Sequence, residues 1–144
     1  MTVSSLPMPE LSAAEPAPPS RRSVLLDRAL KVAGGVLAVL MALLTAILEL
    51  QLSGLRVGGA LIGVSVPIAL AANLGISWFA QRATDTKWAV ALPALVWLGI
   101  MLIASGETTE GDFLLTGWVG LATMAAGAAG FTVAGIRMIL APAR

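Results

Sequence analysis

Few side chains in this sequence could carry chemistry, because it contains no histidine, no cysteine and no tyrosine. Their absence removes the commonest proton shuttle, the thiol nucleophile and most ligands of transition metals. What remains is a small number of carboxylates and a net charge of +1. The composition therefore disfavours an enzyme and predicts no cofactor, no metal and no nucleic-acid partner.

Glu49 borders a long apolar run, and a carboxylate inside a membrane span often binds a proton or a cation. It follows Lys31 by eighteen residues, or about 27 Å along a helix axis, which places it at the outer boundary of a span. We therefore expect Glu49 to face water or headgroups and to pair loosely with Arg56 across the turn. Alternatively, both residues lie inside the mouth of a helix bundle and form a functional gate.

Asn73 is the polar side chain that the pattern places deepest in an apolar run. Pro93 removes one helical hydrogen bond from a neighbouring run and frees the carbonyl oxygen of Ala89. We expect the Asn73 amide to form a hydrogen bond between helices, with that carbonyl as a candidate acceptor, contributing about 0.6–2 kcal/mol. This structural role is favoured over contact with a substrate.

An acidic turn contains Glu107, Glu110 and Asp112, whose oxygens could hold a divalent cation. The three residues lack the regular ligand spacing of a calcium loop. A solvated turn that keeps positive charge away from this side of the chain is the favoured interpretation, and no metal site is predicted.

Hydrophobic residues make up 58% of the 144 positions and charged residues only 12%, with a mean hydropathy of +0.91. A soluble domain is typically about 45–50% apolar and about 25% charged. Charge-free runs long enough to span about 30 Å of hydrocarbon alternate with short polar turns. The sequence thus predicts an all-α polytopic membrane protein, a bundle of four transmembrane helices at about 29–52, 57–79, 88–105 and 113–138.

The distribution of positive charge predicts the orientation of these helices. With the N-terminus inside the cell, every lysine and arginine except Arg56 falls on the cytoplasmic side, which is the usual bias in a cell membrane. Residues 1–23 are rich in Pro, Ser and Ala and are expected to form a disordered cytoplasmic tail, with residues 24–144 forming the membrane domain. The C-terminus is likewise predicted to be cytoplasmic.

Small residues recur every four positions in the last apolar run, at Ala122, Ala126, Gly130 and Ala134. On a helix this spacing places them on one face, where another helix can approach closely. That neighbour is either another helix of the chain or a second subunit, and the sequence leaves both open.

With seven Arg against two Lys and spans rich in Ala, Gly, Val and Leu, the chain resembles the small four-span membrane proteins of unknown function found in high-GC Gram-positive (actinobacterial) bacteria. The resemblance implies a fold and transfers no functional residue. We expect a non-catalytic accessory or scaffold subunit of a membrane assembly, whose partners are the lipid bilayer and either another membrane protein or further copies of the chain. The alternative is a small transporter or channel for a neutral or weakly charged solute.

Overall fold

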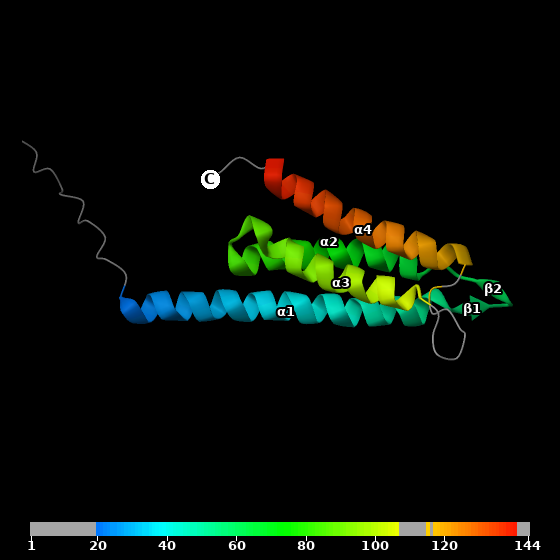
Figure 1. Cartoon of the computed structure of the whole chain (residues 1–144), viewed down its shortest axis with the longest axis horizontal. Coiled ribbons are helices and arrows are strands. Elements are labelled where there is room, and N and C mark those ends of the chain that lie inside the picture. Colours follow the sequence, from blue (N-terminus) through cyan, green and yellow to red (C-terminus); the bar gives the residue numbers. More distant parts are fainter. Residues whose placement is uncertain (1–19, 107–114, 116, 141–144) are drawn as a thin grey trace, which may run out of the picture.

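The computed structural model describes residues 20–106, 115 and 117–140, which form an all-helical fold apart from one short hairpin (Figure 1). The elements are α1 (Arg21–Ser53), β1 (Arg56–Val57), β2 (Ala60–Leu61), α2 (Ser65–Thr84), the 3-10 helix η1 (Lys87–Val90), α3 (Ala91–Ala104) and α4 (Gly117–Leu140). Most of the predicted tail lies outside the described residues. Its last three residues belong to α1.

Helix α1 begins eight residues earlier than the predicted start at residue 29. Ser20 caps it, because the Ser20 hydroxyl oxygen accepts a hydrogen bond from the backbone N–H of Ser23 at 3.3 Å. Residues 21–30 are all exposed, and Figure 1 shows this part of α1 extending past the other helices. The length of the apolar run therefore does not show which part of α1 packs against other helices.

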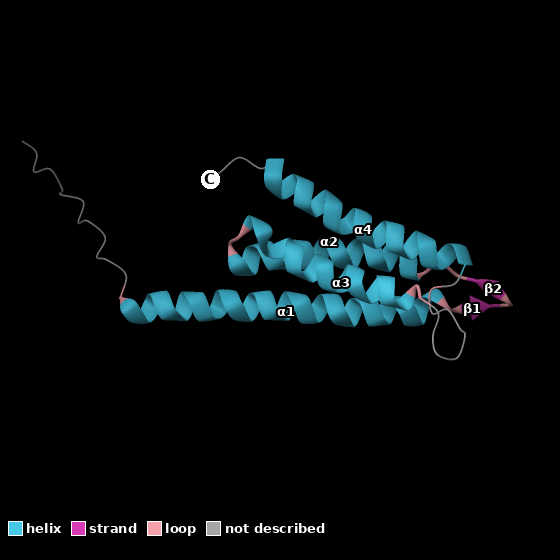
Figure 2. Ribbon diagram, viewed as in Figure 1, coloured by secondary structure: helices cyan, strands magenta, loops and turns pink. Residues whose placement is uncertain are grey.

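The hairpin replaces the first turns of the helix predicted over 57–79. Strands β1 and β2 are antiparallel, with Arg56 opposite Leu61, and they are joined by Gly58 and Gly59 (Figure 2). Both glycines have positive φ, 59° and 83°, the conformation that a two-residue hairpin turn requires and that glycine adopts without strain. Helix α2 consequently begins at Ser65 instead of residue 57.

Both prolines of the middle helices lie in a first helical turn. Pro67 is the third residue of α2 and Pro93 is the third residue of α3. Backbone N–H groups in a first turn have no partner within the helix, so a proline costs little there. These prolines therefore lie at the starts of the two helices and do not bend them.

Helix α2 packs against both α1 and α4, and α3 packs mainly against α1. Three alanines on one face of α1, Ala38, Ala42 and Ala46, are fully buried, which allows the neighbouring backbones to approach closely. Larger side chains, among them Ile76, Trp97 and Met101, fill the centre. The core thus contains residues of all four α-helices, and the most extensive packing is that of α2 against α4.

Among the described residues, three segments are long and apolar enough to cross a membrane. These are Arg21–Ser53, Lys87–Ala104 and Gly117–Leu140. Helix α2 is not among them, because its twenty residues include Asn73, Gln81 and Arg82, while part of the apolar stretch expected to precede them forms the hairpin. Three long apolar helices are typical of a membrane-embedded protein.

Candidate functional site

Glu49 lies in the interior, which corrects the expectation that it faces water or headgroups. Its side chain is completely buried, and its Oε2 accepts a hydrogen bond of 2.9 Å from the indole Nε1 of Trp97. Trp97 is the seventh of the fourteen residues of α3, so the carboxylate lies beside the body of that helix. The distance from Lys31 misplaced Glu49 because α1 extends beyond its neighbours at the N-terminal end.

The structure does not bring Glu49 and Arg56 together. Arg56 is exposed on β1, whereas Glu49 points into the core, and within the described residues the ion pair is a different one, Lys31 with Asp27 at 3.0 Å. The predicted loose pairing across the turn is absent from this part of the chain, and the proposed gate of the two residues loses its geometric basis.

Asn73 is fully buried on α2, as expected, but its amide does not join two helices. Neither Nδ2 nor Oδ1 has a hydrogen-bond partner within the described residues, so the bond predicted to the Ala89 carbonyl is not formed. The backbone carbonyl of Asn73 is occupied, because it accepts a 2.7 Å hydrogen bond from the hydroxyl of Ser77. The two polar atoms of the side chain, in contrast, make no hydrogen bond within the described residues.

Trp97 contacts Glu49, and both Trp97 and Asn73 border Gly127 of α4. A Cβ on Gly127 would clash with the six-membered ring of Trp97 and would lie 2.8 Å from Asn73 Nδ2. Thus one edge of the indole donates to Glu49 while another lies close to Asn73. Sequence reasoning missed both Trp97 and Gly127, since an indole and a glycine within apolar runs are usual packing residues.

The small-residue face of α4 is rotated from the predicted stripe. Gly130 and Ala134 are buried, but Ala122 and Ala126 are only half-buried. The packed face instead passes through Thr123 and Gly127, one position further along the chain from each half-buried alanine. This face meets α2 of the same chain, since a Cβ on Gly130 would lie 3.0 Å from the backbone oxygen of Leu70.

Thr123 also makes a polar contact between helices. Its hydroxyl oxygen lies 2.7 Å from that of Ser65 on α2, and both side chains are fully buried. Thr123 donates its own proton to the carbonyl of Val119 at 2.8 Å, so Ser65 is the donor in the contact between the two hydroxyls. This contact is satisfied on both sides, unlike the amide of Asn73.

The predicted acidic turn at Glu107, Glu110 and Asp112 lies outside the described residues. Within the described part of the chain there is no group of three acidic, histidine or cysteine side chains that could hold a metal ion. The candidate site is therefore the buried set of Glu49, Trp97 and Asn73, which we call the Glu49 site.

The Glu49 site offers two oxygens without a partner in the described structure, Oε1 of Glu49 and Oδ1 of Asn73, together with the Asn73 amide donor. A carboxylate and an amide in such a position can bind a small polar or positively charged group. No family model matches the chain, and no curated protein or solved structure shows significant similarity to it.

Proposed function

We propose that the protein is an integral protein of the cell membrane that crosses the bilayer four times, with both termini in the cytoplasm. Helix α2 packs against α1 and α4, so it lies alongside two of the three segments that are apolar enough to span. Arg82 in the last turn of α2 and Lys87 at the start of η1 flank the turn between these helices, while the hairpin at the opposite end of α2 carries Arg56. The positive-inside bias supports this orientation.

Within that topology, we propose that the Glu49 site binds a small monovalent cation and that the protein is a small cation transporter. The observation that carries this proposal is a fully buried carboxylate with one oxygen lacking a partner in the described structure. Burying such an oxygen in a low-dielectric interior is costly unless something binds to it, and ionisable side chains inside spans usually mark ion or proton pathways.

The charge and ligand types of the site define the class of cation. A single carboxylate balances one positive charge, and a carboxylate oxygen is a ligand that hard cations accept. The hydrogen bond from Trp97 fixes Oε2 and leaves Oε1 as the free ligand. This arrangement suits a proton, an alkali-metal ion or a primary ammonium group, and no catalytic step is included.

An accessory role is the second candidate, and one observation favours it. The N-terminal part of α1 extends past the other helices, where Leu25, Leu26 and Leu30 are exposed. A partner membrane protein or a second copy of the chain would cover such a surface without any need for transport. In that case the Glu49–Trp97 hydrogen bond would serve only to hold α1 against α3.

Flux measurements in proteoliposomes test the two candidates. Purified protein would be reconstituted under inward gradients of protons, Na⁺ or methylammonium, and uptake would be compared for wild type, Glu49→Gln and Asp85→Asn. Glu49→Gln keeps an acceptor for Trp97 and removes the charge, whereas Asp85 is an exposed carboxylate at the end of α2. We expect flux of one cation in wild type and Asp85→Asn and its loss in Glu49→Gln.

Two results would contradict the transporter proposal. The first is an absence of flux for every cation from protein that remains folded by circular dichroism. The second is equal flux in wild type and Glu49→Gln. Stoichiometric copurification of another membrane protein in mild detergent, together with no flux, would instead support the accessory role.

A further inference from the structure

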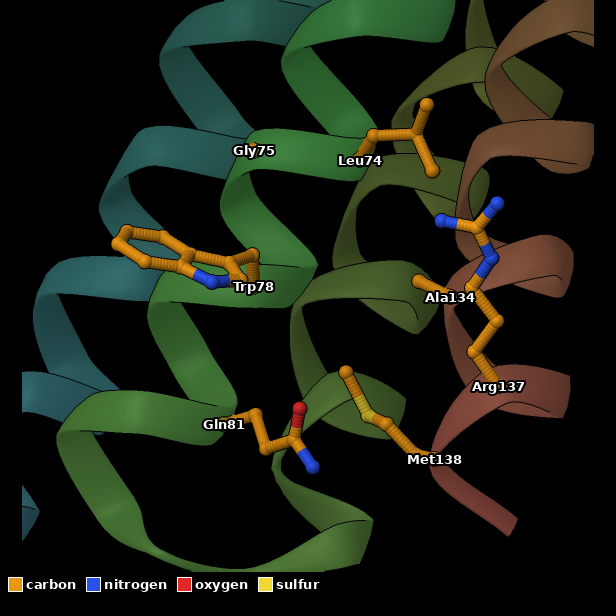
Figure 3. Close-up of a pocket in the computed structure, with 7 residues that line it drawn as sticks. All are labelled: Leu74, Gly75, Trp78, Gln81, Ala134, Arg137 and Met138. Atoms are coloured by element: carbon orange, nitrogen blue, oxygen red, sulfur yellow. The ribbon is translucent and has the colours of Figure 1, made fainter. Parts of the chain in front are cut away.

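A cleft of about 410 Å³ opens between α2 and α4, close to the C-terminal ends of both helices (Figure 3). Its walls are largely apolar, with Leu74 on α2 and Ala134 and Met138 on α4. Two polar side chains also line it, Gln81 and Arg137. The cleft thus combines an apolar wall with a cation and an amide.

Arg137 supplies the unbalanced charge. Figure 3 shows its side chain extending along α4 toward Ala134 and the level of Leu74, so that the guanidinium lies over the apolar part of the cleft. Within the described residues this guanidinium has no ion-pair partner, since the ion pair found there joins Lys31 and Asp27. A guanidinium beside apolar side chains at the membrane is stabilised by an anion, which it can bind through two hydrogen bonds.

The surroundings of the cleft match those of a membrane interface. Trp78 also lines the cleft, and the guanidinium of Arg82 lies 5.5 Å from the centre of the Trp78 ring. Tryptophan is enriched at the level of the headgroups, and basic side chains on the cytoplasmic side attract anionic lipids. Both features occur at the end of α2 for which we propose a cytoplasmic location.

We propose that this cleft is a binding site for one anionic phospholipid of the cytoplasmic leaflet. Its phosphate binds the guanidinium of Arg137, and an acyl chain lies along Leu74 and Ala134. The apolar wall selects a lipid over free phosphate, and the cation selects an anionic lipid over a zwitterionic one. The inference rests on the proposed membrane location but not on transport through the Glu49 site.

Gly75 gives a way to block the cleft without disturbing the core. It lines the cleft, and a Cβ built on it meets no atom within 4 Å. Gly75→Leu therefore places a side chain in the space assigned to the acyl chain. Gly99 of α3 is a matched control, because its Cβ also meets no atom within 4 Å and it does not line this cleft.

The experiment is native mass spectrometry of protein exchanged from nanodiscs of equal phosphatidylglycerol and phosphatidylcholine content. Wild type, Lys87→Gln and Gly99→Leu are expected to retain one phosphatidylglycerol. Arg137→Gln and Gly75→Leu are expected to bind it roughly tenfold more weakly, equivalent to about 1.4 kcal/mol. Lys87 is a suitable control because it lies at the same end of the molecule but lines a different cleft, between η1, α3 and α4.

Several outcomes would overturn the proposal. Equal retention in wild type and Arg137→Gln would do so, as would equal retention of phosphatidylcholine and phosphatidylglycerol. Displacement of the lipid by inorganic phosphate alone would show a phosphate site, and a dimer that forms only when Gly75 is unblocked would show a second copy of the chain as the occupant. Thermal melting in phosphatidylcholine alone, equal for all variants, establishes that each remains folded. None of these readouts depends on cation flux, so a failure of the transporter proposal would not affect this test.

Discussion

The indole nitrogen of Trp97 donates a 2.9 Å hydrogen bond to the carboxylate of Glu49, and this bond joins α3 to α1 in the interior of the protein. Trp97 also contacts Phe131 of α4, with ring centres 5.8 Å apart and ring planes inclined at 56°. A single side chain therefore links three helices. Its polar edge and its aromatic face are separable by mutation.

Trp97→Phe should separate them, because it keeps an aromatic ring near Phe131 and removes the donor to Glu49. We expect a loss of about 2 kcal/mol in the free energy of unfolding, since the buried carboxylate is left without its partner. The measurement is unfolding in mixed detergent followed by circular dichroism. A double-mutant cycle with Glu49→Leu should give a coupling energy of about 0.5–3 kcal/mol, and simple additivity of the two losses would show that the bond contributes nothing.

Gly127→Ala should be strongly destabilising for its size. The added methyl group would meet the Trp97 ring and Asn73 Nδ2, so the core must shift at a cost of about 1–3 kcal/mol. Gly135 of the same helix is the matched control, because its Cβ would meet no atom within 4 Å. Gly135→Ala should instead be neutral or raise the free energy of unfolding by up to about 1 kcal/mol. Equal effects at the two positions would disprove the close packing at Gly127.

Asn73→Leu should leave the protein at least as stable as wild type while impairing binding at the Glu49 site. Leucine has a similar shape, and it removes two buried polar atoms that lack partners in the described structure, worth about 1 kcal/mol or more. Thermal unfolding in detergent and cation flux should be measured on the same preparation. A large loss of stability would mean that the amide bonds helices together, as the sequence first suggested.

Thr123→Val should cost more stability than Ser65→Ala. In Ser65→Ala, the Thr123 hydroxyl still donates to the carbonyl of Val119, whereas Thr123→Val deprives the buried Ser65 donor of its acceptor. Losses of polar contacts between membrane helices average about 0.6 kcal/mol and reach about 1.7 kcal/mol. The order of the two mutants in the same unfolding assay is the test, and the reverse order would make Thr123 the donor.

The proposed four-span topology makes a prediction independent of the site. Reporter tags inserted after Gly54 and within residues 107–112 should both be extracellular, while tags at the two ends of the chain should be cytoplasmic, because nearly all basic residues lie on that side. Protease accessibility in intact cells provides the readout. Cytoplasmic tags at both internal positions would exclude four spans.

The sequence by itself determined the class of the protein, because runs of uncharged apolar residues can satisfy their backbone only as helices in lipid. It also indicated that Asn73 would be buried, as it is. It misjudged the start of α2, since the local preference of Gly58 and Gly59 for positive φ outweighed the apolar character of the following residues. Helix formation in apolar runs and the turn at Gly58 and Gly59 are features that depend on residues close together in the sequence.

Only the tertiary structure decided which polar groups meet. Glu49 is buried because Trp97 of α3 packs against this part of α1, so its depth depends on where α3 lies and not on its distance from Lys31. Likewise, the face of α4 that packs passes through Gly127 instead of Ala126, since the bulk of Trp97 must be accommodated at that point. Burial and rotation of a helix are set by its partners, and a single sequence of mostly apolar residues carries little information about them.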